Sequence, residues 1–309
     1  MYRAIIACLL WGSAFAGAKI GFEYTNPLHL SGMRFTLAGM LLFPILWRQH
    51  VNLKELFKHW RFLSLFAFLQ TFMQYGLFFM GLNLVPAATA AIIIGAGPLF
   101  VAIMAHFFMP GDRMTMRKVI AIGLGLLGVV SISLKKGDVL ASSSDFYLGI
   151  ALLLTSNLVG GYTNIMVAKY KAKLSPVALT SYANFFGGLL LYAVSLVVTH
   201  PEFKIYPIEF YGALIWLAII PAAAFSLWYG LLQRPGVKVS DLNVWKFIVP
   251  VTGCVLSWLI VPGEYPDANS ITGIVIISMA LIILQLPQQL TQKLKRSMQK
   301  LKLALSKFK

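Results

Sequence analysis

Residues 98–112 read PLFVAIMAHFFMPGD, and residues 250–264 read PVTGCVLSWLIVPGE. Each stretch is an apolar segment that begins at a proline and ends in Pro-Gly followed by an acidic residue. The spacing from the first proline to the acid is the same in both, and Pro98 and Pro250 lie 152 residues apart. These repeated landmarks predict that the chain contains two copies of one structural unit.

A second pair of landmarks supports this duplication. Pro27 and Gly39 correspond to Pro176 and Gly188 with a common offset of 149 residues.

Of the 309 residues, 59% are hydrophobic and 12% are charged, and the mean hydropathy is +0.78. A soluble domain carries about a quarter charged residues. The composition therefore predicts a polytopic helical membrane protein and excludes a soluble α/β enzyme, a disulfide scaffold and a disordered chain.

Ten apolar segments approach the length of about 20 residues that a membrane-spanning helix needs. We predict spans at residues 3–22, 29–47, 61–82, 87–109, 118–134, 147–167, 177–199, 212–234, 238–262 and 271–287. Because five helices per copy is an odd number, the second copy enters the membrane in the opposite orientation. The predicted fold is an all-α integral membrane protein with ten transmembrane helices in two inverted five-helix repeats, at 3–134 and 147–287. This architecture is common among transporters and places the site where the halves meet.

The distribution of basic residues predicts the orientation. With the N-terminus in the cytoplasm, the predicted cytoplasmic segments hold 20 Lys and Arg residues, and the outer loops hold 3. Cytoplasmic loops of membrane proteins are rich in these residues. We therefore expect a multi-pass protein of the cell (inner) membrane with both termini cytoplasmic. The net charge of +16 then indicates contact with anionic membrane lipid and not with nucleic acid. Residues 288–309 predict a basic amphipathic cytoplasmic tail on the inner leaflet.

Lys246 is the most informative candidate for function, because it lies near the centre of a predicted span. A charged side chain there costs about 3 kcal/mol or more. Three interpretations stay open: the lysine is held by the backbone carbonyl that Pro250 leaves free or by neighbouring polar groups, it pairs with a carboxylate or phosphate of a cargo, or it extends toward the cytoplasm. Burial disfavours an ammonium ion, so release of its proton makes protons a candidate coupling ion. Two further basic residues, Lys19 and Arg34, also lie within spans.

Polar and aromatic side chains in the middle of several spans predict a cavity around Lys246. The candidate substrate-binding residues beside it are Trp11, Gln70, Gln74, Tyr75, Asn157, Tyr162, Trp228 and Tyr229. Gln70 and Gln74 share one helix face because they are four residues apart. Each of these side chains alone is more often an interhelical hydrogen bond than a ligand contact. Gly95, Gly97 and Pro98 predict a break in the middle of the fourth span.

Signatures of enzymes are absent from the sequence. The five histidines form no metal-binding spacing, and we find no phosphate-binding loop, nucleophile elbow or pair of intramembrane aspartates. We therefore expect no catalytic residue, metal or cofactor. Movement of a small molecule across the membrane fits better, with an amino acid or organic anion as the cargo. Efflux of drug-like or aromatic compounds, and a non-transporting membrane scaffold, are the alternatives.

The opening of the chain resembles EamA-type permeases of the drug/metabolite transporter superfamily. The matching residues are the run LWGSAFAGAK at 10–19, Pro27, the run MRF at 33–35, Ala38 and Gly39, together with the repeated segments at 98–112 and 250–264. The resemblance covers about residues 4–286. It implies ten helices in two inverted repeats, with a central cavity lined by spans 1, 3, 4, 6, 8 and 9, and export or exchange of amino acids, related metabolites and aromatic compounds.

Overall fold

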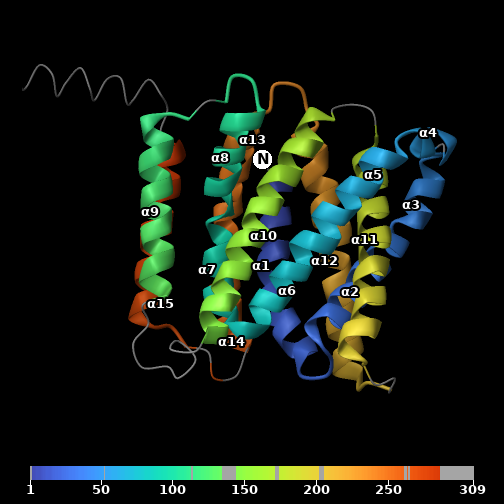
Figure 1. The fold of residues 1–309 in the computed structure, drawn as a ribbon, viewed down its shortest axis with the longest axis horizontal. Coiled ribbons are helices and arrows are strands. Elements are labelled where there is room, and N and C mark those ends of the chain that lie inside the picture. The colour runs from blue at the N-terminus through green and yellow to red at the C-terminus, as the bar shows by residue number, and fades with distance from the viewer. Residues whose placement is uncertain are drawn as a thin grey trace, which may run out of the picture.

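The computed structural model describes residues 2–51, 53–112, 114–133, 144–170, 174–201, 205–260, 263 and 265–285. Within these ranges the regular structure is helical, and no strand occurs. The helices stand side by side as an upright bundle (Figure 1). The predicted tail at 288–309 lies outside the described residues.

The first half of the bundle runs from α1 to α9. The helices are α1 (Tyr2–Phe22), α2 (Pro27–Leu41), α3 (Phe43–Arg48), α4 (Leu53–Lys58), α5 (Trp60–Ala67), the π-helical segment η1 (Phe68–Met73), α6 (Gln74–Leu84), α7 (Ala87–Gly95), α8 (Gly97–Phe108) and α9 (Met116–Ser133). The second half contains α10 (Ser144–Lys169), α11 (Pro176–Thr199), α12 (Ile208–Leu232), α13 (Val239–Asn243), the 3₁₀ segment η3 (Val244–Phe247), α14 (Ile248–Ile260) and α15 (Ala268–Gln285).

Helical structure occupies each range predicted as a span, and the ends differ by at most four residues. Among the described residues, seven helical segments are long and apolar enough to cross a membrane. They are Tyr2–Phe22, Pro27–Arg48, Trp60–Leu84, Thr89–Phe108, Ser144–Lys169, Pro176–Thr199 and Ile208–Leu232. Two shorter apolar helices follow, Val251–Ile260 and Ala268–Ala280. An all-helical architecture with several helices long and apolar enough to span a membrane is therefore confirmed for the described residues.

Helix starts follow from local sequence. Asn26 and Ser175 cap α2 and α11, because each side chain accepts a hydrogen bond from a backbone N–H of the first turn. Pro27 and Pro176 follow as the first helical residues, where a missing N–H is tolerated. The two caps lie at the same offset as the repeated landmarks.

Two breaks interrupt helices in the middle of the bundle. α7 ends at Gly95 and α8 begins at Gly97, so the break predicted from Gly95, Gly97 and Pro98 is confirmed. The second break is η3, which contains Lys246 and precedes Pro250. Proline removes one backbone donor and frees a carbonyl one turn earlier. Both breaks therefore stand where the sequence places a proline at mid-span.

The close approach of α2 and α11 depends on glycine. A Cβ on Gly39 would lie 2.5 Å from the backbone nitrogen of Phe185, and one on Gly32 would lie 2.5 Å from the backbone nitrogen of Tyr192. Small residues let helix backbones approach in a membrane, where apolar burial alone drives little association. The Ser181 hydroxyl also donates to the carbonyl of Gly39 at 3.0 Å. α2 and α11 consequently form one rigid pair.

The remaining packing has a regular order. α9 packs along α15 at one edge of the bundle, with α3 and α4 at the opposite edge (Figure 1). α7 packs along α14 in the interior. α1 packs against α12 and α14, while α10 packs against α6 and α8. The centre of the bundle is thus surrounded by α1, α6, α8, α10 and α12.

Candidate functional site

A cavity of about 100 Å³ lies at the centre of the bundle. It is lined by Trp11, Ala14, Phe15, Arg34, Gln70, Gln74, Tyr75, Phe78, Ile94, Gly97, Val101, Ser156, Asn157, Gly160, Gly161, Asn164, Phe225, Trp228, Tyr229, Lys246 and Val249. A water molecule occupies about 30 Å³ of liquid volume. The cavity in this conformation therefore has room for a few waters.

The ammonium group of Lys246 lies beside two indole rings in this cavity, at similar distances from both. Its Nζ is 5.3 Å from the ring centroid of Trp11 and 4.9 Å from that of Trp228. The two indoles are themselves in edge contact, with centroids 5.1 Å apart. A cation over an aromatic face within about 6 Å is stabilised by roughly 0.5–2 kcal/mol. The rings hold the ammonium in place without neutralising its charge.

The indole of Trp228 is oriented by α10. Its Nε1 donates to the side-chain oxygen of Asn164 at 3.0 Å, and Asn164 in turn donates to the carbonyl of Gly160 at 2.7 Å. Trp228 is nearly fully buried, at 1% exposed. A buried indole N–H needs such an acceptor. The Asn164 amide therefore fixes one wall of the Lys246 site.

A second asparagine of α10 stabilises the break between α7 and α8. Asn157 Nδ2 donates to the carbonyl of Ile93 at 2.8 Å, just before the break. A Cβ on Gly97 would lie 3.1 Å from the Asn157 side-chain oxygen. Asn157 thus has a structural hydrogen bond and also faces the cavity. This combination is expected where irregular backbone lines a cavity inside a membrane protein.

Glycine on α10 makes room for Gln74 on α6. A Cβ on Gly160 would lie 2.7 Å from Gln74 Nε2. The Ser156 hydroxyl donates to the backbone carbonyl of Gln74 at 2.8 Å, directly after the π-helical segment η1. π-helical turns appear often at functional sites because they leave backbone groups free. Here η1 also carries Gln70, whose side chain lines the cavity.

Several buried polar atoms of cavity residues have no hydrogen-bond partner among the described residues. They are Trp11 Nε1, Arg34 Nε and Nη1, Gln70 Nε2 and the Tyr229 hydroxyl. Each can donate a hydrogen bond. Unpaired buried donors are uncommon and costly. No Asp or Glu occurs among the described residues that line the cavity. The cavity consequently presents donors and two cations, which are complementary to an anionic or acceptor-rich molecule.

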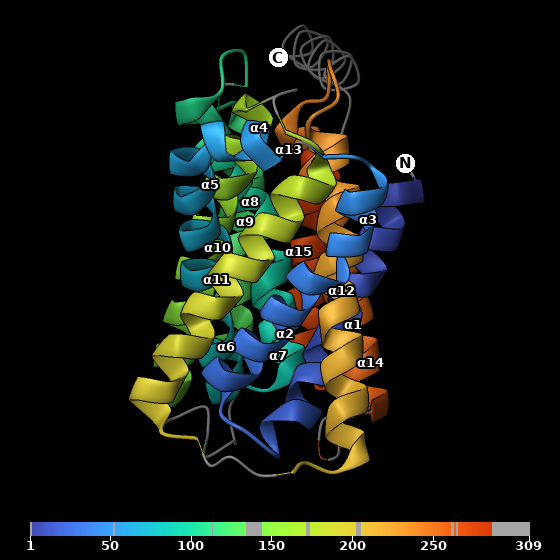
Figure 2. The ribbon, with the colours of Figure 1, turned by 90° about the vertical axis from the view of Figure 1, so that its right-hand side faces the viewer.

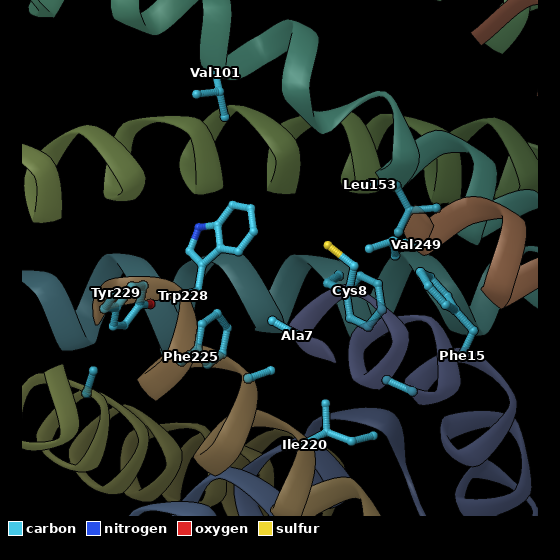
Figure 3. Close-up of a cluster of buried hydrophobic side chains, with 14 of the residues drawn as sticks. Ala7, Cys8, Phe15, Val101, Leu153, Ile220, Phe225, Trp228, Tyr229 and Val249 are labelled. Carbon is cyan, nitrogen blue, oxygen red and sulfur yellow. The ribbon is translucent and has the colours of Figure 1, made fainter. Parts of the chain in front are cut away.

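The rest of the wall is apolar and aromatic. Phe225, Trp228 and Tyr229 of α12 lie in one buried cluster with Phe15 of α1, and Val101 of α8 lies above them in the view of Figure 3. The rings of Phe225 and Tyr229 stack with centroids 5.3 Å apart. An apolar wall with a few placed polar groups is typical of small-molecule sites.

No candidate metal centre occurs in the part of the chain that the structure describes. No group of three or more His, Cys, Asp or Glu side chains is placed to hold an ion there.

Comparisons with known proteins agree with this architecture. A model of the EamA-like transporter family matches residues 2–134 and 147–286. The chain belongs to this family. It is therefore a membrane protein of a transporter family, and the resemblance to EamA-type permeases that the sequence shows is confirmed. Family and relatives indicate a transporter, which is not an enzyme.

Several relatives of this EamA-family chain carry transporter names. The uncharacterized transporter YyaM of Bacillus subtilis (strain 168) is 24% identical over 254 residues, which cover 81% of this chain and 82% of that protein. The S-adenosylmethionine/S-adenosylhomocysteine transporter of Chlamydia trachomatis serovar L2 is 24% identical over 274 residues, which cover 86% and 83%. One protein of known crystal structure, 18% identical, matches with a TM-score of 0.71 over 92% of this chain and 96% of that chain. This last match bears on the fold alone.

Eight of the nine side chains predicted to bind substrate line the one cavity: Trp11, Gln70, Gln74, Tyr75, Asn157, Trp228, Tyr229 and Lys246. Tyr162 does not line it, and its ring instead contacts Phe108 at 5.4 Å between centroids. The cavity lies among the segments that the EamA resemblance implies, with Arg34 of α2 in addition. The structure brings the eight together, while their role in binding stays a prediction.

Sequence reasoning did not single out the apolar members of the wall. Phe15, Phe78, Phe225, Ile94 and Val249 line the cavity, but an apolar residue in an apolar span carries no signal of its own. Only their helical spacing from the polar members would have indicated them.

Proposed function

We propose that this protein is an inner-membrane secondary transporter that exports or exchanges a small metabolite with a carboxylate, an amino acid or organic anion, by alternating access. The observation that carries the proposal is Lys246, whose ammonium lies in a central cavity without a carboxylate among the described lining residues. A charge at membrane depth is rare and marks a transport pathway in most known cases. A cargo carboxylate would neutralise the ammonium during the transport cycle.

The geometry favours the cargo-pairing interpretation of Lys246 over the structural one. A structural lysine in a membrane span donates to a backbone carbonyl, as Lys19 does to the carbonyl of Val85 at 2.7 Å. Lys246 contacts two indole faces instead. Those contacts orient the ammonium but leave its three N–H groups available to an oxygen ligand. The bound anion would then complete the site.

Inverted five-helix repeats are supported by the packing order. If the first five predicted spans correspond to the second five, then α1 corresponds to α10, α12 to the α5–α6 segment, and α14 to the α7–α8 segment. The contacts of α1 with α12 and α14 then match those of α10 with α6 and α8. The pairs α2 with α11 and α9 with α15 each map onto themselves. This is the pattern expected of a pseudo-two-fold axis in the membrane plane.

Local structure supports the same correspondence. α9 and α15 begin with equivalent caps, in which Thr115 accepts from the N–H of Lys118 and Asp267 accepts from the N–H of Ser270. These pairs lie 152 residues apart, the offset of the repeated proline segments. We therefore propose ten transmembrane helices, in repeats at 3–134 and 147–287, with the site between the halves.

The proposed orientation places both termini in the cytoplasm. The N-terminus, α4 and α13 lie at the same end of the bundle (Figure 2). Basic residues near this end include Arg3, Lys58, Arg61, Arg234 and Lys238. That asymmetry is the one expected of a cytoplasmic face in contact with anionic lipid. The basic tail at 288–309 would extend the same surface, and protons remain our candidate coupling ion.

Efflux of aromatic compounds is a second candidate, because rings dominate the cavity wall. Trp11, Tyr75, Phe225, Trp228 and Tyr229 all line it. A cationic drug is disfavoured, since two cations would repel it. The chlamydial relative is named for S-adenosylmethionine and S-adenosylhomocysteine. Both compounds carry a carboxylate and an aromatic base, and the sulfonium cation of the first fits this cavity less well than the uncharged sulfur of the second. A cargo that carries both features fits the cation and the rings of this cavity together.

Replacement of Lys246 by Met tests the proposal. The exchange keeps the side-chain volume and removes the charge, so we expect normal insertion but loss of anionic or zwitterionic cargo export. The measurement compares metabolites exported by cells that carry wild type or Lys246→Met, normalised to folded protein, with thermal stability in detergent alongside. Lys246→Arg should restore export only in part, because the guanidinium is larger and planar.

Lys19→Met is the matched control for this experiment. It removes an equivalent charge from a span without touching the cavity wall. Export per folded molecule should stay at the wild-type level in this variant. If Lys246→Met exports as much per folded molecule as Lys19→Met does, the charge-pairing role is wrong and a membrane scaffold or a structural lysine becomes the better account.

A further inference from the structure

Arg34 is a buried cation that the proposed function leaves unused. It lies on α2, is 2% exposed, and lines the same cavity as Lys246. Among the described residues it has neither an ion pair nor a hydrogen bond, and its Nε and Nη1 are buried and unpaired. Its contacts are aromatic: its Cζ is 4.6 Å from the ring centroid of Phe35 and 4.9 Å from that of Phe79.

This arrangement differs from that of a structural arginine. A buried guanidinium that only stabilises helix packing normally has its donors satisfied by carbonyls or carboxylates. Two other cations of this chain follow that rule: Lys19 donates to the carbonyl of Val85, and Lys118 pairs with Asp112. Arg34 lies against the cavity with its donors unpaired. A partner for these donors must therefore enter from the cavity.

Arg34 and Lys246 contact different aromatic surfaces of the site. They rest on different ring pairs, Phe35 with Phe79 for Arg34, and Trp11 with Trp228 for Lys246. Between these pairs runs a continuous series of ring contacts that passes through Tyr75 and Phe225. The successive centroid distances are 4.5 Å from Phe35 to Tyr75, 5.9 Å to Phe225 and 5.4 Å to Trp11.

We infer that the cavity binds a substrate with two anionic groups, one for Lys246 and one for Arg34, joined by a flat or apolar body that lies on the rings between them. This inference rests on the proposed function and specifies its substrate class as a dianion. A carboxylate or phosphate fits Arg34 because a guanidinium donates to two oxygens of one group. The single-anion cargo of the general proposal would leave the Arg34 donors unpaired.

Two probes with the same ring separate one anionic group from two. Benzoate carries one carboxylate, and terephthalate carries a second at the opposite end of the ring. The full-length protein is purified in detergent, and the dissociation constant of each probe is measured by calorimetry. A hydrogen bond to a charged group contributes on the order of a tenfold gain in affinity or more. We therefore expect terephthalate to bind wild type at least about tenfold more tightly than benzoate.

The variants test the two cations separately. Arg34→Met should abolish the advantage of terephthalate over benzoate, and Arg34→Lys should retain part of that advantage because a point charge remains. Lys246→Met should weaken both probes. Arg61→Met, which removes a charge from an exposed side chain outside the cavity, is the control and should bind both probes as wild type does.

The outcomes distinguish this inference from the general proposal. If wild type binds the two probes equally, or binds neither, the dianion class is wrong. It is also wrong if Arg34→Met keeps the advantage of terephthalate, because water alone would then satisfy the Arg34 donors. Equal loss of both probes in Arg34→Met also overturns it, because Arg34 would then support the whole cavity. If the Arg34 variants behave as expected but Lys246→Met changes the dissociation constant of neither probe, the pairing role of Lys246 is wrong instead.

Discussion

At the scale of single residues, the site depends on side chains that hold other side chains in place. Lys246 contacts the indole of Trp228, Trp228 donates to Asn164, and Asn164 donates to the carbonyl of Gly160. Each member of this series is positioned by the next, and the last is backbone of α10. Asn164 is therefore a positioning residue, because it acts on the cation through the indole.

Asn164→Leu tests this role. Leucine keeps the number and branching of the side-chain heavy atoms but leaves the buried indole N–H without an acceptor. Loss of one partner of a buried hydrogen bond costs about 1–3 kcal/mol. We expect a lower midpoint of thermal unfolding in detergent and weaker export per folded molecule, because the indole no longer holds one position over Lys246.

Asn83 on α6 provides the control, since it is an exposed asparagine in the same bundle. Asn83→Leu should leave both measurements at the wild-type level. An Asn164→Leu protein with the midpoint and the export rate of Asn83→Leu would show that the hydrogen bond to Trp228 contributes nothing.

The polar members of the cavity could be predicted because an ionisable or amide group at mid-span needs a reason to be there. Tyr162 shows the limit of that rule. It lies five residues from Asn157, about 140° around a helix of 3.6 residues per turn. Asn157, Gly160, Gly161 and Asn164 share the opposite side, which faces the cavity. Polarity alone identified the span, and helix phase was needed to identify the face.

At the scale of elements, the helix pair α2–α11 is the tightest contact of the bundle and supports Arg34 from behind. Gly39 and Gly188 each face backbone of the other helix at distances that leave no room for a methyl group. Both glycines belong to the repeated landmarks, so the sequence indicated their importance before their partner was known. The sequence could not indicate that the two helices carrying these glycines, α2 and α11, pack against each other.

Gly39→Ala should separate this pair. The new Cβ would lie 2.5 Å from the Phe185 nitrogen, so one helix must shift. Overpacking of this kind costs about 1–3 kcal/mol. Gly123→Ala on α9 is the control, because a Cβ there meets nothing within 4 Å. Alanine also has a higher helix propensity than glycine. We expect a lower unfolding midpoint for Gly39→Ala and an unchanged or higher one for Gly123→Ala. Equal midpoints would contradict the close packing.

Element boundaries were predictable where a cap, a proline or a charged loop marked them, as at Pro27, Pro98 and Pro176. The π-helical segment η1 was not. Its residues Phe68–Met73 are ordinary for a helix, and the feature that accompanies it is tertiary, a hydrogen bond from Ser156 to the carbonyl of Gln74. A single-sequence pattern contains no such information about a distant partner.

At the scale of the whole molecule, the cavity explains why family and fold leave the cargo open. It has a volume of about 100 Å³ between helices that pack closely around it. The structure therefore reveals the chemistry of the walls, two cations and several aromatic rings, and not the shape of the bound molecule.

The orientation of the whole bundle follows from its charge. Twenty basic residues in predicted cytoplasmic segments against three in outer loops give a large free-energy preference for one orientation, because each Lys or Arg resists transfer across the membrane. A green fluorescent protein fused after Lys309 should fluoresce, and alkaline phosphatase at the same position should be inactive, since each reports on one side of the membrane. The matched control fuses the same two reporters after Lys136, in the outer loop between the predicted fifth and sixth spans. There the phosphatase should be active and the green fluorescent protein should not fluoresce. An active phosphatase at both Lys309 and Lys136 would mean an even number of spans between them. The inverted repeat would then be wrong, because an odd number of spans per copy is what gives the second copy the opposite orientation.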